Sequence, residues 1–218
     1  TPNPTGSTTP GGTGASNGER SYNNTAVGNV NVTNFGPVKS IFSTSAAHTT
    51  GADLAIGETL VYRLVTDLPE GTQTNLTIAD VLPAGFTYVG NPLMSFIANT
   101  DVTENAGLSG ADNDALPPTF AVPSYAGAGT VGVEVSGQTV TFHLGDVINN
   151  DSDSGAPKGT EQVVIDFTVV VNNDANTNNI DLKNNNYTVS TNNGSGVLTL
   201  RQTSNTVTAR IVEPLPTI

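Results

Sequence analysis

Hydrophobic and polar residues alternate along most of the chain, and this alternation predicts β-strands. In the segment 59–66, Leu60, Tyr62 and Leu64 fall on one face of the expected strand. The segment 161–171 shows the strongest alternation in the chain. A period of two places successive side chains on opposite faces of a sheet. No window has a convincing period of 3.6 residues, so we expect little helix.

Turn-forming residues divide the alternating pattern into many short strands. The least regular stretch, 91–130, is expected to be a long loop. Short strands with frequent turns predict an all-β fold: an immunoglobulin-like β-sandwich with Greek-key connections and long loops. Besides the two strands above, the pattern predicts strands over 37–43, 74–82, 86–89, 131–135, 139–144, 187–190, 197–202 and 203–212.

Local composition divides the chain into three parts. Residues 1–18 are rich in Pro, Gly, Ser and Thr without apolar periodicity, which predicts a flexible linker. Residues 19–36 predict one or two short strands. These strands belong either to the tail of a preceding repeat or to the first part of a split domain. Residues 37–218 form the main predicted immunoglobulin-like repeat.

The overall composition excludes several classes of function. The chain has 19 Asp and Glu against 7 Lys and Arg, a net charge of -12, so it lacks the basic surface that binds nucleic acid. It has no Cys, which excludes disulfides and cysteine metal ligands. The chain contains no apolar run of about 18 residues, so the sequence predicts no membrane-spanning segment. Thr and Asn supply 57 residues (32 and 25), a bias typical of secreted bacterial surface proteins whose long sheets face water.

The sequence shows no catalytic constellation, so we expect that the chain is not an enzyme acting on an external substrate. Its two histidines are His48, in a loop rich in Thr and Ala, and His143, on the polar face of a predicted strand. No Gly-rich phosphate loop leads from a strand into a helix. The carboxylates are scattered over loops, and no pair with glycosidase spacing can be argued from them.

Four short motifs occur in a fixed order from residue 56 onward. They are IGETLVY (Ile56–Tyr62), IADVLPAGFTYV (Ile78–Val89), LGDV (Leu144–Val147), and SNTV (Ser204–Val207) followed by VEP (Val212–Pro214). Together they resemble the conserved bacterial surface repeat that is catalogued as domain of unknown function eleven. That repeat is similar to isopeptide-forming fimbrial domains and occurs in large repeats-in-toxin adhesins. The resemblance covers about residues 37–218.

The resemblance implies an extracellular module on a bacterial cell surface. Such a module is a structural connector that positions the ligand-binding domains of a large adhesin away from the cell. The implied partners are neighbouring repeats of the same chain, and a host, surface or biofilm ligand reached through adjacent domains. Two alternatives stay open. One is a domain that itself binds carbohydrate, ice or another cell, and the other is a filament subunit whose N-terminus adds as a strand to a neighbour.

Three polar residues, Lys39, Asp80 and Asn205, each alternate in phase with apolar neighbours that are expected to be buried. Because an unpaired buried charge is strongly unfavourable, these side chains should be partnered. Related fimbrial domains join a Lys to an Asn through an autocatalytic amide, and an acidic residue relays the proton. The resemblance therefore implies Lys39 as nucleophile, Asp80 as acid and Asn205 as carboxamide. The alternative is a hydrogen-bonded Asp at a strand end, an Asn in a turn and an ordinary surface Lys.

Acidic residues at short spacing also suggest calcium as a cofactor. Asp151 and Asp153 lie one residue apart in a Gly-containing loop, and Asp112 and Asp114 repeat this spacing. Carboxylate and amide oxygens are suitable ligands for a hard cation that takes six to eight oxygens. Glu213 is a further candidate ligand at the junction with a following repeat. The alternative is that these residues form solvated acidic turns.

If calcium binds the folded chain, chelation should lower its melting temperature. A ligand present at about 100 times its Kd stabilises the folded state by roughly 2.7 kcal/mol. We expect thermal unfolding followed by circular dichroism to shift downward when EDTA replaces calcium. The double variant Asp151→Asn, Asp153→Asn should remove part of that shift. An identical melting temperature in calcium and in EDTA would contradict the hypothesis.

Overall fold

The computed structural model describes residues 34–46, 49, 51–97, 102–104, 120–149, 161–174 and 176–212. These residues form strands and loops, with no helix among them and therefore none that could span a membrane. The strands, in chain order, are β1 (Val38–Thr44), β2 (Asp53–Ala55), β3 (Thr59–Asp67), β4 (Gly71–Val81), β5 (Phe86–Ile97), β6 (Val102–Glu104), β7 (Phe120–Ala121), β8 (Gly132–Ser136), β9 (Thr139–Asn149), β10 (Gln162–Val171), β11 (Leu182–Asn185), β12 (Tyr187–Asn192), β13 (Leu198–Thr203) and β14 (Val207–Val212).

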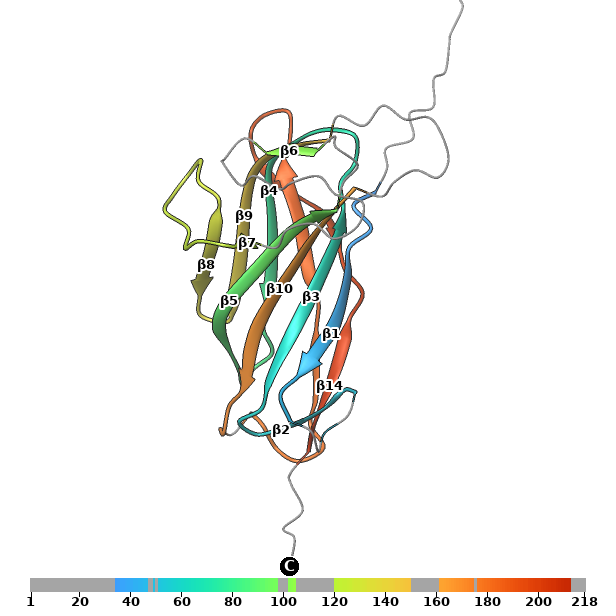
Figure 1. Cartoon of the computed structure of the whole chain (residues 1–218), viewed down its shortest axis with the longest axis vertical. Helices are drawn as coiled ribbons and strands as arrows, with labels where there is room; N and C mark the ends of the chain where they lie inside the picture. Colours follow the sequence, from blue (N-terminus) through green and yellow to red (C-terminus); the bar gives the residue numbers. More distant parts are fainter. Residues whose placement is uncertain are drawn as a thin grey trace, which may run out of the picture. The chain divides into compact units, whose positions relative to one another are not determined.

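The strands form two facing layers and a short third sheet (Figure 1). Sheet A has the strand order β1-β3-β10-β5-β7, and sheet C has the order β13-β12-β4-β9-β6, with β8 also paired to β9. Sheet B contains β11, β14 and β2, and its β2–β14 pair is parallel, whereas the other ladders are antiparallel. Neighbours such as β3 and β10 lie far apart in the sequence, so the chain crosses between the layers. The predicted all-β, immunoglobulin-like sandwich is confirmed.

The core lies between sheets A and C and consists of the inward faces that alternation predicted. Leu60, Tyr62 and Leu64 of β3 are fully buried. In the antiparallel register with β10, Tyr62 pairs with Phe167. The Phe167 ring lies 5.8 Å from the Tyr62 ring and 5.5 Å from the Phe142 ring of sheet C. Each large buried apolar side chain stabilises the fold by about 1.5–3 kcal/mol, so this contact between the layers is a major source of stability.

Several strands are longer than alternation alone predicted. β5 continues to Ile97, so the expected loop 91–130 begins within a strand and also contains β6 and β7. β9 continues to Asn149, and β11 lies within a stretch that its Asn content had marked as a turn. In each place a paired neighbour extends the ladder, because tertiary pairing overrides weak local strand preference. The linker 1–18 and most of the segment 19–36 lie outside the described residues, so the division into domains stays a prediction.

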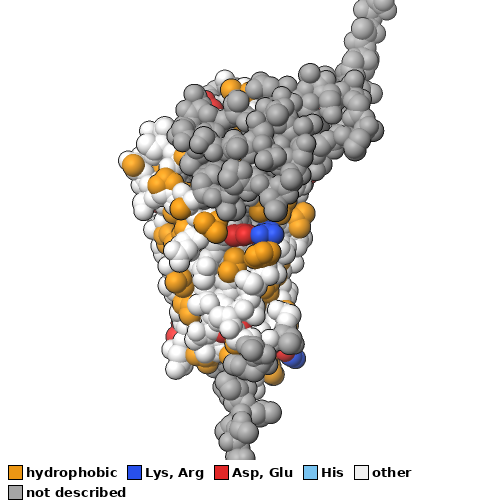
Figure 2. Space-filling view, viewed as in Figure 1, with side chains coloured by type: hydrophobic (Ala, Val, Ile, Leu, Met, Phe, Trp, Pro, Cys, Tyr) orange, Lys and Arg blue, Asp and Glu red, His pale blue; other side chains and the backbone are white. Residues whose placement is uncertain are grey.

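The outward face of sheet A carries few charged side chains and several hydrophobic ones (Figure 2). Arg63 of β3 donates two hydrogen bonds to the Asp166 carboxylate of β10, at 2.8 and 2.7 Å. The ring of Phe42, which is 53% exposed, lies 3.5 Å from the Arg63 guanidinium. The Arg63 guanidinium thus binds the Asp166 carboxylate through its N–H groups, and the Phe42 ring covers one of its faces.

Gly85 of the LPAG motif has a structural reason to be glycine. Its φ of +93° lies in a region that other residues rarely adopt. A Cβ at this position would lie 2.4 Å from Thr177 Cγ2, in the connection that follows β10. The Asn172 N–H also donates to the Gly85 carbonyl at 2.7 Å. The turn before β5 therefore packs closely against the connection that leads to β11.

Glu58 of the GETLVY motif is a buried carboxylate, 4% exposed, that closes the loop between β1 and β2. Its oxygens accept hydrogen bonds from the N–H groups of Ala46 (3.1 Å) and Ala55 (2.8 Å) and from the Thr49 hydroxyl (2.8 Å). Burial by itself raises the pKa of Glu58. The hydrogen bonds from Ala55, Thr49, Ala46 and Thr44 together outweigh burial and lower the pKa below its usual value.

Because the pKa of Glu58 is lower in the folded chain, its ionised form stabilises the fold. This stability is fully present above the unfolded pKa of about 4.3 and is lost as the pH falls through the folded pKa. We expect Glu58→Gln to lower the free energy of unfolding at pH 7 by about 1–3 kcal/mol, as measured by urea denaturation. The variant should also lose less stability than the wild type as the pH falls from about 5 to about 3, the interval that contains the unfolded pKa of Glu.

The exposed Glu70 provides the matched control for this prediction. Glu70→Gln removes the same charge from the surface and should change the free energy of unfolding by less than about 0.5 kcal/mol. Equal effects of the two substitutions would show that Glu58 has no special role in the loop.

Candidate functional site in the core

Two of the residues predicted from strand parity meet in the core. Lys39 of β1 and Asp80 of β4 come from opposite sheets, and both side chains are 0% exposed. The Lys39 Nζ donates a hydrogen bond to Asp80 Oδ2 and forms an ion pair with it. Lys39 is therefore buried, and the alternative of an ordinary surface Lys is wrong. The ion pair crosses the sandwich between its two layers.

The Lys39 ammonium has aromatic surroundings. Its Nζ lies 3.9 Å from the centre of the Tyr62 ring and 5.7 Å from that of Phe167. Burial lowers the pKa of Lys39 to about 8, although Asp80 opposes this shift. Burial also raises the pKa of Asp80, against the opposing effect of Lys39. The two pKa values therefore approach each other, and moving a proton from Lys39 to Asp80 requires less free energy than it would in water.

Asn205 lies near Lys39 but its carboxamide is bound to the main chain. The Lys39 N–H donates to Asn205 Oδ1 at 2.7 Å, and Asn205 Nδ2 donates to the Lys39 carbonyl at 3.0 Å. The parity argument placed Asn205 in phase with β14, but that strand begins only at Val207. Asn205 lies in the irregular connection before the strand, where alternation no longer determines which way a side chain points. Its side chain therefore hydrogen-bonds to the main chain of β1 and not to the Lys39 ammonium.

A different amide, that of Asn185, lies beside the buried charges. Asn185 is 3% exposed and pairs with Val207 in the β11–β14 ladder. Burial raises the pKa of both Tyr62 and Asp80, and the nearby Asn185 amide opposes each shift. Lys39, Tyr62, Asp80 and Asn185 are called the core cluster below. Asn185 gave no signal in the sequence because it stands in a run of three Asn residues without apolar alternation.

The core cluster contains polar atoms whose hydrogen bonds are not satisfied. The Tyr62 hydroxyl, Asp80 Oδ1 and both polar amide atoms of Asn185 are buried without a hydrogen-bond partner of normal geometry. Buried polar atoms are nearly always paired in folded proteins, and each unpaired one costs about 1–3 kcal/mol. Four such atoms lie together here, and the Asn185 amide is close enough to Tyr62 and Asp80 to oppose the rise in the pKa of each, so we take this cluster as the candidate site.

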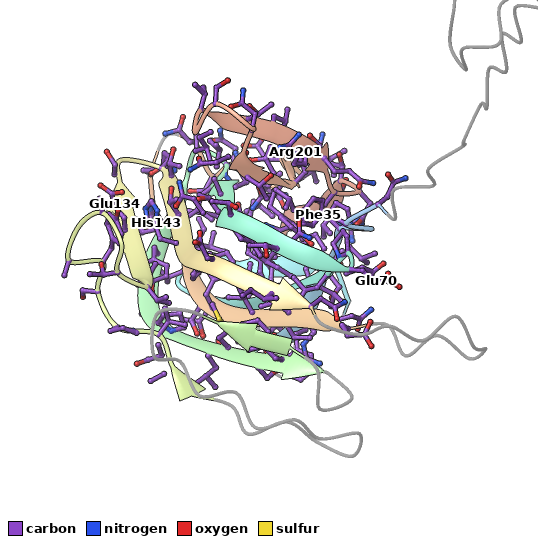
Figure 3. All side chains as sticks on the ribbon, turned by 90° about the horizontal axis from the view of Figure 1, so that it is seen from above. Phe35, Glu70, Glu134, His143 and Arg201 are labelled. Atoms are coloured by element: carbon purple, nitrogen blue, oxygen red, sulfur yellow. The ribbon has the colours of Figure 1, made fainter. Side chains whose placement is uncertain are left out.

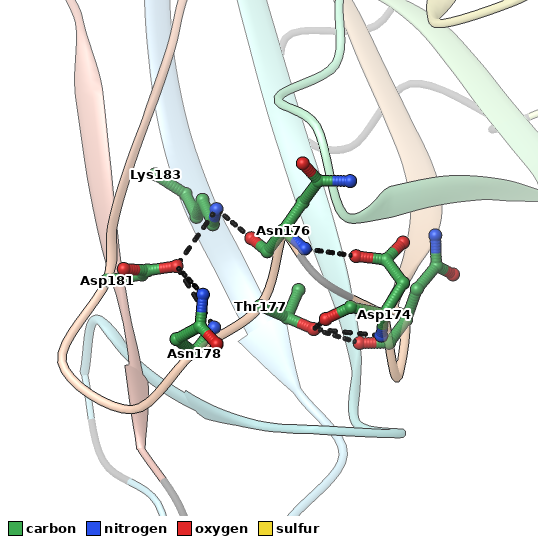
Figure 4. A network of polar contacts seen from close by, with 7 residues as sticks. Asp174, Asn176, Thr177, Asn178, Asp181 and Lys183 are labelled. Carbon is green, nitrogen blue, oxygen red and sulfur yellow. Dashed lines mark hydrogen bonds and ion pairs between the residues drawn. The ribbon is translucent and has the colours of Figure 1, made fainter.

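The connection between β10 and β11 is held in place by its own polar contacts (Figure 4). The Asn176 N–H donates to Asp174 Oδ1 at 2.7 Å, and the Thr177 hydroxyl donates to the Asp174 carbonyl at 3.1 Å. The Lys183 ammonium contacts the Asn176 carbonyl and lies 3.5 Å from Asp181 Oδ2. Since Lys183 lies two residues before Asn185 on β11, these contacts fix the strand that brings Asn185 to the core.

The predicted calcium ligands cannot be placed in the same way. All of them lie outside the described residues, and calcium therefore stays a prediction. Within the described ranges, no group of three acidic or histidine side chains is arranged to hold a metal ion. The predicted ligands are Asp112, Asp114, Asp151, Asp153 and Glu213.

No protein-family model matches the chain, and no curated protein sequence matches it. Similar solved structures include BcpA, the major pilin subunit of Bacillus cereus (TM-score 0.45, 15% identity, covering 80% of this chain and 40% of that chain). The full-length major pilin SpaD of Corynebacterium diphtheriae is also similar (0.44, 16%, covering 79% and 34%). A third is ACE19, the collagen binding subdomain of the Enterococcus faecalis surface protein ACE (0.42, 11%, covering 89% and 99%).

The chain spans less than half the length of the two pilins. The assignment to domain of unknown function eleven and to a repeats-in-toxin adhesin stays a prediction, since no family model matches.

Removing one partner of the buried ion pair should be strongly destabilising. In an Asn185→Ala background, where no covalent bond to that amide can form, Lys39→Met leaves the Asp80 charge without its cation, and we expect the free energy of unfolding in urea to fall by about 3–5 kcal/mol. Combining Lys39→Met with Asp80→Leu removes both charges and should restore part of that loss.

The exposed pair Arg63–Asp166 serves as the control for this experiment. Its side chains are 34% and 15% exposed. Arg63→Met should therefore lower the free energy of unfolding by about 1 kcal/mol, which is less than the loss expected for Lys39→Met. Equal losses for the two single variants, or a double variant no more stable than Lys39→Met, would contradict the role assigned to the buried charges.

Proposed function

We propose that this chain is a structural, load-bearing module of a bacterial surface protein, and that an internal amide between Lys39 and Asn185 joins its strands. The observation that carries the proposal is the core cluster: a buried Lys–Asp pair beside the buried Asn185 carboxamide, whose polar atoms make no hydrogen bond of normal geometry. Lys39 and Asp80 were predicted from the sequence, whereas Asn185 replaces Asn205 as the carboxamide.

The proposed reaction needs no cofactor. A proton moves from the Lys39 ammonium to Asp80, which yields a neutral amine and a carboxylic acid. The amine lone pair attacks the Asn185 Cγ, while the Asp80 acid donates a hydrogen bond to the carboxamide oxygen. The attacking nitrogen gives up one proton, which passes through Asp80 to the amide nitrogen; the C–N bond to that nitrogen then breaks and ammonia leaves. The product is a neutral secondary amide, and the chain loses one nitrogen and three hydrogens.

The surroundings of the cluster favour this chemistry. Burial lowers the pKa of Lys39 to about 8, so the neutral nucleophile is more accessible than for a Lys in water. Burial raises the pKa of Asp80, which favours the protonated acid. The buried Tyr62 hydroxyl is a further donor beside the Asn185 amide.

The amide would connect β1 of sheet A with β11 of sheet B. Lys39 and Asn185 are 146 positions apart (185 − 39). A crosslink that closes a loop of this size stabilises a fold by about 5 kcal/mol in the chain-entropy model. A force applied along the chain past β1 and β11 would then act on a covalent bond. This property is useful in a module that connects a cell to whatever its neighbouring domains bind.

Composition supports the extracellular location. The chain has no Cys, so in an oxidising environment its strands can be joined covalently only by bonds other than disulfides. Its predominantly neutral polar surface is rich in Thr and Asn, as expected for an exported β-sandwich. Calcium bound by the acidic loops would add stiffness and remains part of the proposal.

The intact mass of the purified protein tests the amide. Formation of the bond releases ammonia, so we expect a mass about 17 Da below the value calculated from the sequence. Asn185→Ala should restore the calculated mass of that variant. It should also lower the free energy of unfolding by about 5 kcal/mol, the crosslink contribution estimated above.

Asn205→Ala is the matched control, since it removes an amide that contacts Lys39 only through the main chain. It should keep the loss of about 17 Da, and tryptic mapping should locate the crosslink between Lys39 and Asn185. An unmodified wild-type mass would refute the amide, and loss of the crosslink in Asn205→Ala alone would assign the reaction to Asn205 instead.

A further inference from the structure

The outward face of sheet C contains a groove of about 430 Å³, remote from the core cluster. It lies where two adjacent strands are interrupted opposite each other. The β4–β9 register shifts on both sides of Leu76, whose partner is Gly145. Asn75 and Gly145 both have positive φ, 51° and 71°. Paired irregularities of this kind bend strands and redirect side chains, and in this sheet they accompany a hollow in an otherwise regular surface.

One wall of the groove is an aromatic stack. The Tyr125 ring lies 3.7 Å from the His143 ring, with 16° between the planes. His143 Nε2 also lies 3.1 Å from Glu134 Oε2, and Glu134 and His143 appear together at one side of the sandwich in Figure 3. His143 was predicted to lie on the polar face of its strand, and it does. The stack leaves Tyr125, which is only partly buried, at the edge of the groove.

The loop that carries Tyr125 is held against the edge strand β8. The Tyr125 N–H donates to the Val133 carbonyl at 2.9 Å, and the Val133 N–H donates to the Pro123 carbonyl at 2.8 Å. A Cβ at Gly132 would lie 2.6 Å from the Tyr125 backbone, so this close approach requires glycine. The aromatic wall is therefore built into the fold rather than carried on a free loop.

The rest of the lining offers amide groups and one carboxylate that are held in place by one another. Asp146 Oδ1 accepts the Asn75 N–H at 2.8 Å, and Asn75 Nδ2 donates to Asn192 Oδ1 at 3.2 Å. Leu198, which is 48% exposed, adds an apolar surface. Neither Lys nor Arg is among the lining residues, and the whole chain carries a net charge of -12. An anionic ligand is disfavoured by both facts.

We propose that this groove binds a neutral saccharide. A sugar ring has an apolar C–H face and a rim of hydroxyl groups, which both donate and accept hydrogen bonds. The Tyr125 ring and Leu198 match the apolar face. Asn75, Asp146 and Asn192 match the hydroxyl rim, and the volume falls in the usual range for small-ligand sites. The binding site is independent of the internal amide, so the module would contact glycans directly as well as bearing load.

A glycan array probed with the full chain tests the proposal. The array should hold neutral hexose and N-acetylhexosamine oligosaccharides together with sialylated and sulfated ones. We expect binding to neutral glycans, and isothermal titration with the strongest soluble neutral oligosaccharide then gives a Kd. Tyr125→Ala should raise that Kd at least tenfold, on the order expected for the loss of one stacked aromatic contact. Leu198→Ala, at an exposed position, should raise it several-fold without affecting folding.

Phe42→Ala is the matched control, because it removes an exposed aromatic ring from the opposite sheet. It should leave the Kd unchanged, and all variants should retain the wild-type circular dichroism spectrum. The proposal is overturned if no neutral glycan binds, if only acidic glycans bind, or if Phe42→Ala weakens binding as much as the groove variants do. None of these outcomes bears on the Lys39–Asn185 amide, which is read from the mass.

Discussion

The Lys39 ammonium and the Asp80 carboxylate meet in an apolar core, where each charge has lost its contact with water. Bringing an ion from water into such surroundings costs several kcal/mol, and the attraction between the partners often recovers no more than that. A pair of well-packed apolar residues would serve stability as well or better. The neighbouring structure must therefore supply compensation, and it does so with the Tyr62 ring over the ammonium and the Asn185 amide beside the carboxylate. The same desolvation that makes the pair unfavourable brings the two pKa values together, which is the condition for amide chemistry.

Neutral hydrogen bonds are used where the sheets meet away from this cluster. The Tyr187 hydroxyl reaches across the sandwich from β12 to the Val65 carbonyl and to the Thr66 hydroxyl, the latter at 3.0 Å. Asn205 joins the chain before β14 to the main chain of β1 through two hydrogen bonds. The main chain of β1 is thus held by the hydrogen bonds of Asn205, and its Lys39 side chain is held by the ion pair with Asp80. The Asn205 and Asp80 contacts therefore both hold β1, whereas the Tyr187 contacts hold its neighbour β3.

The strands themselves follow from local patterning, and the motifs that carried the family resemblance have structural reasons of their own. Glu58 in one motif binds the loop between β1 and β2, and Gly85 in another permits close contact with Thr177. What local patterning missed were strands made by pairing alone. β11 lies in a run of Asn residues with no alternation, yet its ladder with β14 makes it a strand. Intrinsic strand preference is weak compared with the hydrogen bonds and burial that a neighbouring strand provides.

The residues of the candidate site differ in the same way, since alternation placed some of them and not others. Lys39 and Asp80 lie in regular strands, where a period of two determines which face a side chain occupies, so the sequence by itself determined that both point into the core. Neither of the two candidate amides lies within a stretch of regular alternation in the sequence. Asn205 precedes its strand and Asn185 belongs to an irregular run, so parity had no basis for choosing between them. Only the tertiary structure shows which amide lies beside Asp80, because the pairing of β11 with β14 places Asn185 there while the connection before β14 turns Asn205 to the Lys39 main chain.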